Sequence, residues 1–170
     1  MEYHNYVIRK IRPEDASAWL SLLSQLMEES EYMLYTKHDR DFNIERCKSH
    51  INNMIISDQS EILLVEADTN KIVGYLLGEI EKMYRKSHVM TLCGGILRSH
   101  QRGFSRKLVE EITLLAKKKG IIKIEFSVLE SNKICINASK RMGFKIEGLK
   151  IQAVKTSNGY ENEYLMGILI

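Results

Sequence analysis

The chain has 170 residues, of which 44% are hydrophobic and 28% charged, and its formal net charge is +3. This length and balance fit one folded domain over residues 1–170, and so small a charge gives no reason to expect a nucleic-acid partner. No apolar run reaches the roughly 18 residues of a membrane span, and the charged start lacks a signal-peptide core, so we expect a cytoplasmic protein. The cysteines are far apart and never in C-x-x-C spacing, which predicts neither a disulfide nor a metal site.

The first third of the chain predicts a strand and two helices. Residues 6–11 alternate as in a strand, Pro13 suits the first turn of a helix, and Asn43 is a plausible N-cap for a second helix. Apolar residues at spacings of three and four mark the faces expected to be buried, which are Trp19, Leu22, Leu23, Leu26 and Met27 in the first helix and Ile44, Cys47, Ile51 and Ile55 in the second.

Three β-rich runs follow, at residues 61–67, 71–81 and 88–97. Residues 68–70 have the composition of a hairpin turn, so the first two runs should be antiparallel neighbours. The Gly94-Gly95 pair inside the third run predicts a β-bulge or the close approach of a ligand, because glycine weakens the interior of a strand.

A polar turn leads from the third run into an amphipathic helix. Its apolar face, expected to pack on a sheet, consists of Phe104, Leu108, Ile112, Leu115 and Ala116. Gly103 would open the N-terminus of this helix, where unpaired backbone N–H groups and the positive dipole end suit a phosphate. The alternative is an ordinary turn, since the sequence has neither the P-loop nor the dinucleotide-binding glycine pattern.

The last third of the chain predicts a strand, a helix and a hairpin. Residues 121–128 should form a strand parallel to the one before the central helix, because strand, helix and strand imply a right-handed crossover. Ser131 or Asn132 caps a further helix, and residues 144–156 and 160–170 are long strands joined by an Asn-Gly turn. The chain therefore predicts a mixed α/β sheet with helices on its faces and a ligand crevice where two strands diverge.

Three segments in this order resemble the GNAT superfamily of N-acetyltransferases, and the resemblance covers essentially the whole chain. The acetyl-CoA signature Q/R-x-x-G-x-G/A falls on residues 100–105 and keeps Gly103. A second signature, N-x-x-A-x-x-L/F-Y-x-x-x-G-F, falls on residues 132–144 and keeps its asparagine and its final Gly-Phe pair. Residues 155–166 resemble the terminal hairpin of a bacterial subgroup.

The resemblance implies a mixed, mostly antiparallel sheet of about seven strands with a splayed parallel pair, flanked by about four helices. It also implies acetyl-CoA as co-substrate and no metal, with the diphosphate on backbone N–H groups of the turn and the pantetheine along an open strand edge. His100 and Ser105 depart from the signature, which would narrow the phosphate site. The implied cofactor-binding residues are Gly95, Ile96, Leu97, Gln101, Arg102, Gly103, Phe104, Ser105, Arg106 and Asn132.

The chemistry implied is direct attack of a primary amine on the thioester within a ternary complex. Glu79 and Glu125 are the strand glutamates that could accept the amine proton, although each could instead be a solvent-facing strand residue. A backbone N–H near Ile96 or Leu97 would stabilise the oxyanion. Ser139 stands where many family members have a tyrosine that protonates the leaving thiolate, so we expect Ser139 to hydrogen-bond the sulfur while water or a nearby tyrosine supplies the proton.

The acceptor is expected beside the segment that follows the first helix. Residues 28–35 are acidic and aromatic, and Glu28, Glu31 and Tyr32 would suit a cationic amine such as a polyamine, an amino-sugar or a basic peptide end. The alternative is a frayed helix end with a solvated acidic rim. Residues 165–170, if they formed a sheet edge, could pair with another copy of the chain in a homodimer.

Two other functions stay open at the level of the sequence. One is a non-catalytic acyl-CoA sensor, which the serine at position 139 and the altered signature favour. The other is an interaction module without a cofactor, for which binding of coenzyme A at the Gly103 turn is the deciding observation.

Overall fold

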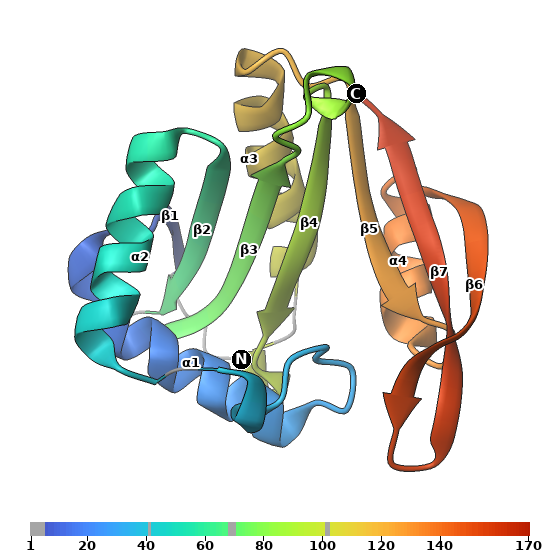
Figure 1. The fold of residues 1–170 in the computed structure, drawn as a ribbon, viewed down its shortest axis with the longest axis horizontal. Coiled ribbons are helices and arrows are strands. Elements are labelled where there is room, and N and C mark those ends of the chain that lie inside the picture. Colours follow the sequence, from blue (N-terminus) through green and yellow to red (C-terminus); the bar gives the residue numbers. More distant parts are fainter. Residues whose placement is uncertain (1–5, 41, 68–70, 101–102) are drawn as a thin grey trace.

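Residues 6–40, 42–67, 71–100 and 103–170 are described by the computed structural model, and they form a seven-stranded sheet with α-helices on both faces (Figure 1). The strand order is β1-β2-β3-β4-β5-β7-β6, and every neighbouring pair is antiparallel except β4 and β5. The strands are β1 (Tyr6–Lys10), β2 (Ser60–Ala67), β3 (Ile72–Ile80), β4 (Val89–Ile96), β5 (Lys123–Leu129), β6 (Lys145–Thr156) and β7 (Gly159–Leu169), and the helices are α1 (Ala16–Glu29), α2 (Ile44–Ser57), α3 (Phe104–Lys118) and α4 (Lys133–Arg141). This arrangement confirms the mixed sheet with one parallel pair that the sequence predicts.

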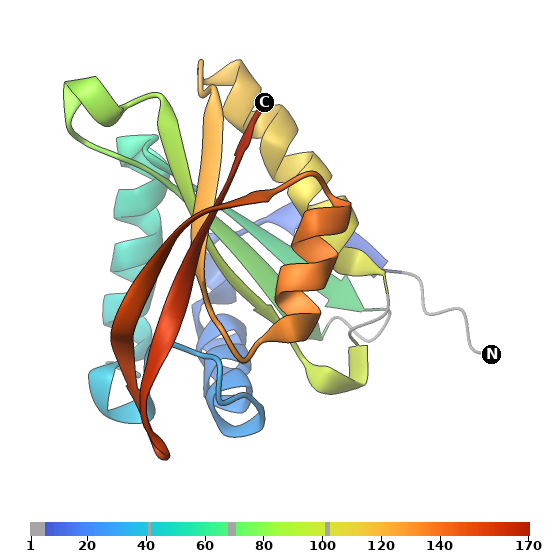
Figure 2. The same cartoon turned by 90° about the vertical axis from the view of Figure 1, so that its right-hand side faces the viewer.

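Helices α1 and α2 cover one face of the sheet, and α3 and α4 cover the other (Figure 2). Two glycines show the contacts directly, since a Cβ at Gly95 would lie 3.0 Å from Leu26 of α1, whereas a Cβ at Gly78 would lie 3.0 Å from Ile112 of α3. Gly78 is paired with Leu92 of β4. Because side chains alternate between the faces of a strand, odd-numbered residues of β4 face α1 and even-numbered ones face α3.

The buried stripe of α1 agrees with the sequence pattern, while that of α2 is narrower than predicted. Trp19, Leu22, Leu23 and Leu26 are buried in α1, as are Cys47 and Ile51 in α2. The prediction that Ile44 and Ile55 also face inward is wrong, because each is 48% exposed. They stand in the first and last turns of α2, so only its middle turns pack on the core. None of the helices in the described residues is both long and apolar enough to cross a membrane.

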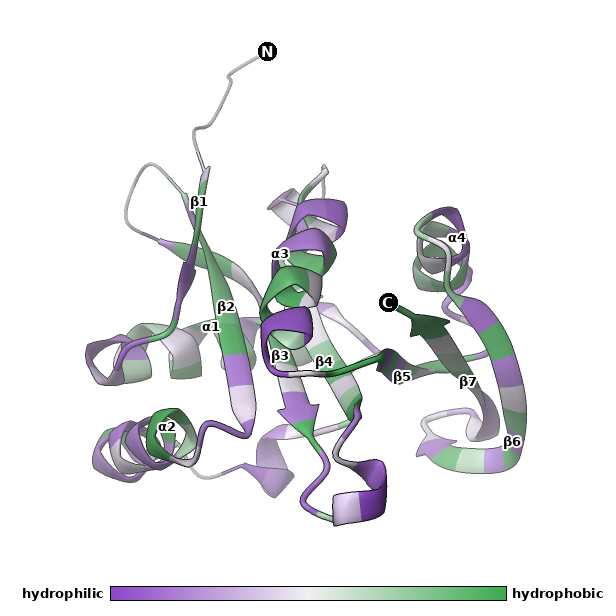
Figure 3. Cartoon of the chain, turned by 90° about the horizontal axis from the view of Figure 1, so that it is seen from above, coloured by the Kyte–Doolittle hydropathy of each residue, from purple (hydrophilic) through white to green (hydrophobic). Residues whose placement is uncertain are grey.

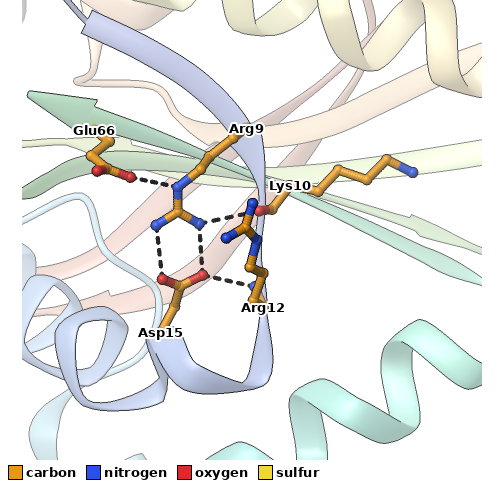
Figure 4. A network of polar contacts seen from close by, with 5 residues as sticks. All are labelled: Arg9, Lys10, Arg12, Asp15 and Glu66. Carbon is orange, nitrogen blue, oxygen red and sulfur yellow. Dashed lines mark hydrogen bonds and ion pairs between the residues drawn. The ribbon is translucent and has the colours of Figure 1, made fainter. Parts of the chain in front are cut away.

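An arginine on β1 ties the edge of the sheet to the start of α1 (Figure 4). The guanidinium of Arg9 donates to both carboxylate oxygens of Asp15, over 2.7 and 2.8 Å, and its Nε donates to Glu66 of β2. Asp15 also accepts the Arg12 backbone N–H, so its carboxylate closes the turn before α1. These contacts, above all the bond from Arg9, hold the pKa of Asp15 below its usual range.

The Gly94-Gly95 pair lies in a regular stretch of ladder, so the predicted bulge in β4 is wrong. The β3–β4 register runs without a shift from Gly74 opposite Ile96 to Ile80 opposite Met90. The glycines instead allow close packing. A Cβ at Gly94 would lie only 2.6 Å from the carbonyl oxygen of Tyr75, closer than real Cβ atoms approach other heavy atoms.

The terminal hairpin closes the sheet with β6 at its edge. Strand β7 lies between β5 and β6, so the expectation that residues 165–170 form an edge available to a second copy is not met. Along β6 the hydrophobic and hydrophilic residues alternate in bands (Figure 3), and Ile146, Leu149 and Ile151 are exposed.

Candidate active site

The parallel pair β4 and β5 separates after a short ladder. Val89, Met90 and Thr91 pair with Lys123, Ile124 and Glu125, and the pairing ends there. Beyond that point β4 continues beside β3 as far as Ile96, while β5 continues beside β7 as far as Leu129 (Figure 1). The splayed parallel pair implied by the sequence resemblance is therefore confirmed.

Beyond the splay, the outer edge of β4 exposes backbone polar groups. His88 O accepts hydrogen bonds from Ile122 N and Lys123 N on the β5 side, and Leu97 N donates to Val73 O on the opposite side, over 2.9 Å. Because successive residues of a strand turn their N–H and C=O groups to opposite sides, the even-numbered residues face β5. Of the three β4 residues predicted to bind cofactor, Ile96 thus presents its amide to the splay, whereas Gly95 and Leu97 bond toward β3.

The α3 N-terminus lies just past this open edge. Gly103 is its N-cap and has φ of 90°, in the left-handed region that favours glycine. As the N-cap, Gly103 has no side chain to cap the helix, and the first turn has no acidic residue. The backbone N–H groups of the first turn are therefore left for a ligand or water, and the dipole end carries no compensating carboxylate.

The other predicted cofactor residues surround this N-terminus to different degrees. Ser105 and Arg106 are exposed on the first turn, and Phe104 packs against Tyr6 with 4.1 Å between ring centroids. Gln101 and Arg102, also predicted to bind the diphosphate, lie outside the described residues.

The two candidate proton acceptors lie in one row across the sheet. Glu79 is opposite Thr91, and Thr91 is opposite Glu125, so all three side chains point to the α1 face at the point where the strands part. Lys123 forms ion pairs with Glu125 over 2.8 Å and with Glu147 over 2.7 Å. Both bonds raise the pKa of Lys123, and the bond to Glu125 has the larger effect. Glu79 is exposed and makes no ion pair within the described part of the chain.

Ser139 and Asn132 are both on α4, on the opposite side of the sheet. Ser139 is 4% exposed and hydrogen-bonds the thiol of Cys135, whose pKa is raised by burial and partly lowered again by that bond. Asn132 is the N-cap, and its Oδ1 accepts the Cys135 N–H over 3.1 Å. The cap thus uses one of the two polar atoms of the Asn132 amide.

Two acidic side chains of the segment after α1 have partners within the chain. Glu28 forms an ion pair with Lys37, and Glu29 accepts the Arg98 backbone N–H over 2.9 Å. The Arg98 side chain in turn donates to Glu29 O, and a shallow surface pocket is lined by Glu28, Glu29, Arg98 and Ser99. Glu31 and Tyr32 are exposed. This segment therefore offers a weaker cation-attracting surface than its composition predicts.

A family model described as the acetyltransferase (GNAT) domain matches residues 8–165. The chain belongs to the GNAT acetyltransferase family. Structures of similar fold include a GNAT acetyltransferase from Streptococcus pneumoniae, with a TM-score of 0.90, 24% identity, and coverage of 98% of this chain and 100% of that chain. The yncA protein of Salmonella typhimurium, solved with acetyl-CoA, has a TM-score of 0.84, 15% identity and coverage of 97% and 94%. A chimera of Vibrio cholerae spermidine N-acetyltransferase SpeG has a TM-score of 0.77, 20% identity and coverage of 96% and 95%.

In this GNAT domain a second group of polar side chains lies on the α1 face, and sequence reasoning did not find it. The Tyr75 hydroxyl of β3 lies 3.9 Å from Cys93 Sγ of β4, and the Arg40 guanidinium lies 4.6 Å from the centroid of the Tyr35 ring. Burial raises the pKa values of Tyr75 and Cys93, and the positive charge of Arg40 partly offsets both increases. Arg40 comes from an aperiodic segment, whose contacts no local pattern predicts.

Within the described residues, no group of three or more histidine, cysteine, aspartate or glutamate side chains is arranged to hold a metal ion.

Proposed function

We propose that this domain transfers an acetyl group from acetyl-CoA to a primary amine by direct attack within a ternary complex. The observation that carries the proposal is the open β4 edge, with the Ile96 amide on it, leading to the uncapped α3 N-terminus at Gly103. Together they offer hydrogen bonds to an extended amide-containing arm and an electropositive end for a diphosphate. The family membership and the acetyl-CoA bound to the yncA protein support this assignment.

The diphosphate would sit on backbone N–H groups from Gly103 to Arg106, and the sequence prediction extends this site to Gln101 and Arg102, which lie outside the described residues. Gly103 leaves open space there, because a Cβ on it would meet no described heavy atom within 4 Å. Arg106 is exposed and adds a positive charge beside the amides. Asn132 keeps its Nδ2 group for the cofactor, since its cap uses only Oδ1.

Acetyl-CoA would supply a thioester whose C–S bond breaks as the new amide bond forms. Glu79 accepts the proton of the attacking amine, directly or through water, because its carboxylate has no cationic partner within the described residues. Glu125 is held in an ion pair by Lys123, so its carboxylate is already engaged and is less free to take the amine proton. A backbone N–H on the open, β5-facing side of β4 would donate to the carbonyl oxygen as charge develops on it. Ser139 hydrogen-bonds the leaving sulfur, and water protonates it.

A screen of primary amines with acetyl-CoA tests this function, with thiol release followed by colour and the acetylated amine identified by mass spectrometry. We expect N-acetylated product and stoichiometric free thiol. Binding of coenzyme A in calorimetry without transfer to any amine would instead identify an acyl-CoA sensor. If coenzyme A does not bind at all, the remaining explanation is an interaction module without a cofactor.

The role of Ser139 has its own test. Ser139→Ala should lower kcat several-fold with little change in coenzyme A affinity, because one hydrogen bond to the sulfur is lost. Ser139→Tyr restores the residue that many family members carry and should change kcat as well. Unchanged turnover in both variants would show that Ser139 is not beside the thioester.

A further inference from the structure

Two buried hydrogen-bond donors on the α1 side of the sheet have no partner among the described residues. They are the indole Nε1 of Trp19, a residue only 4% exposed, and the Nε of Arg40. A buried donor without a partner costs about 1–3 kcal/mol, so such groups usually mark a place that a ligand or ordered water completes.

Both donors lie around Tyr75. The Trp19 and Tyr75 rings meet edge to face with centroids 6.2 Å apart, and the Arg40 charge acts on the Tyr75 hydroxyl. That hydroxyl is next to Cys93, the second residue of β4 after the parallel ladder with β5 ends. Tyr75 therefore connects the Trp19 ring and the Arg40 charge to the stretch of β4 where the thioester would lie.

The group is rich in donors and carries one unbalanced positive charge. Arg40 forms no ion pair with a described carboxylate, and its guanidinium carbon lies over the Tyr35 ring, 4.6 Å from the centroid. In the preceding segment Glu28 pairs with Lys37, and the Glu29 carboxylate accepts the Arg98 backbone N–H. A guanidinium is suited to donating two parallel hydrogen bonds to one carboxylate.

We propose that Arg40 and Trp19 bind a carboxylate of the acceptor, so that the acceptor is an amine that also carries a carboxylate, as an amino acid does. The proposal rests on the acetyl transfer described above and names the acceptor class for that same site. Glu79 lies on the same face of the sheet, two rows from Cys93, and takes the proton of the amine while Arg40 holds the other end. A polyamine would instead bring its extra positive charges toward Arg40.

Matched amines separate this acceptor class from the others. The panel contains amino acids, their carboxamides, spermidine and 2-aminoethyl phosphate, each assayed by thiol release at saturating acetyl-CoA. We expect kcat/KM for the best amino acid to exceed that of its carboxamide at least tenfold, because the carboxamide leaves the guanidinium without a charged partner. A preference for spermidine or for the phosphate would overturn the carboxylate assignment.

Substitution of the donors completes the test. Arg40→Gln should lower kcat/KM for the amino acid ten- to a hundredfold, mainly through KM, and leave the carboxamide within about threefold, whereas Arg40→Lys should recover part of the loss. Trp19→Phe keeps the buried ring and removes only the N–H, so it should cost a smaller, several-fold loss. Arg85→Gln, at an exposed arginine between β3 and β4, is the control and should leave kcat/KM unchanged for both the amino acid and its carboxamide.

The outcomes distinguish this inference from the proposed function. If no amine is acetylated although coenzyme A binds, acetyl transfer itself is refuted. If amines are acetylated but Arg40→Gln affects the amino acid and its carboxamide equally, acetyl transfer stands and the carboxylate site is refuted.

Discussion

Replacing Gly103 by alanine tests the proposed binding site of the diphosphate. The same replacement at Gly120 is a matched control. Gly103 begins α3 with φ of 90°, and Gly120 follows the end of α3 with φ of 75°. At both positions a Cβ would meet no described heavy atom within 4 Å. The two substitutions therefore impose the same backbone strain without a steric clash, but only one lies at the proposed phosphate site.

The stability cost should be the same for both variants. An alanine in the left-handed region is less stable than glycine by about 1–2 kcal/mol, so each variant should lose about that much free energy of unfolding. The effect on binding should differ. A methyl group at Gly103, or the backbone shift that relieves its strain, would break at least one charge-assisted hydrogen bond to a phosphate, worth about 1.5–3 kcal/mol, which is roughly a ten- to hundredfold loss of affinity.

Urea unfolding and calorimetric titration with coenzyme A measure the two quantities. We expect equal shifts of the urea midpoint for Gly103→Ala and Gly120→Ala, and weakened coenzyme A binding for Gly103→Ala alone. If both variants bind coenzyme A as tightly as the parent protein, the diphosphate does not rest on this turn, and the acetyl-CoA assignment loses its structural basis.

Three other predictions concern stability and catalysis. Arg9→Met should lower the free energy of unfolding by about 2 kcal/mol at neutral pH, because it leaves Asp15 partly buried and unpaired. The depressed pKa of Asp15 means that this contribution is present above about pH 4 and is lost as the pH falls through its folded-state pKa, so urea titrations should show parent and variant converging in acid. Gly94→Ala should cost about 2–3 kcal/mol by forcing a methyl against a β3 carbonyl, whereas Gly148→Ala, with open space around it, should cost far less. Glu79→Gln should lower kcat about a hundredfold without changing coenzyme A affinity in calorimetry.

The elements that sequence periodicity predicts well are those whose partners are broad surfaces. The apolar spacing around Trp19 and Ile112 identified faces that are buried against the sheet. The same spacing failed for Ile44 and Ile55, because periodicity specifies which side of a helix is apolar but not how far the surface beneath it extends.

In the candidate site, the features that depend on local sequence were predictable, and those that depend on contacts between distant residues were not. Gly103 was predictable because a left-handed residue between a strand and a helix has a local signature. The pairing of Glu28 with Lys37 and the stacking of Arg40 on Tyr35 occur inside a segment without periodicity, where the tertiary path of the chain decides the contacts. Composition there indicated an acidic surface, and the ion pair of Glu28 with Lys37 removes part of that charge.

The splay lies where β5 stays paired with β7 after its pairing with β4 has ended, and it fixes the direction in which a ligand can lie. Strand β5 pairs with β7 from Lys123 to Leu129 but with β4 only as far as Glu125, so the terminal hairpin holds β5 away from the rest of β4. The five β4 residues after Thr91 extend over roughly 16 Å at about 3.3 Å per residue. We propose that a ligand along this edge has its anionic end at Gly103 and its other end beside Cys93. The reacting carbon would then lie two residues along β4 from the row that contains Glu79, which is why proton transfer and recognition of the acceptor are both expected on the α1 face.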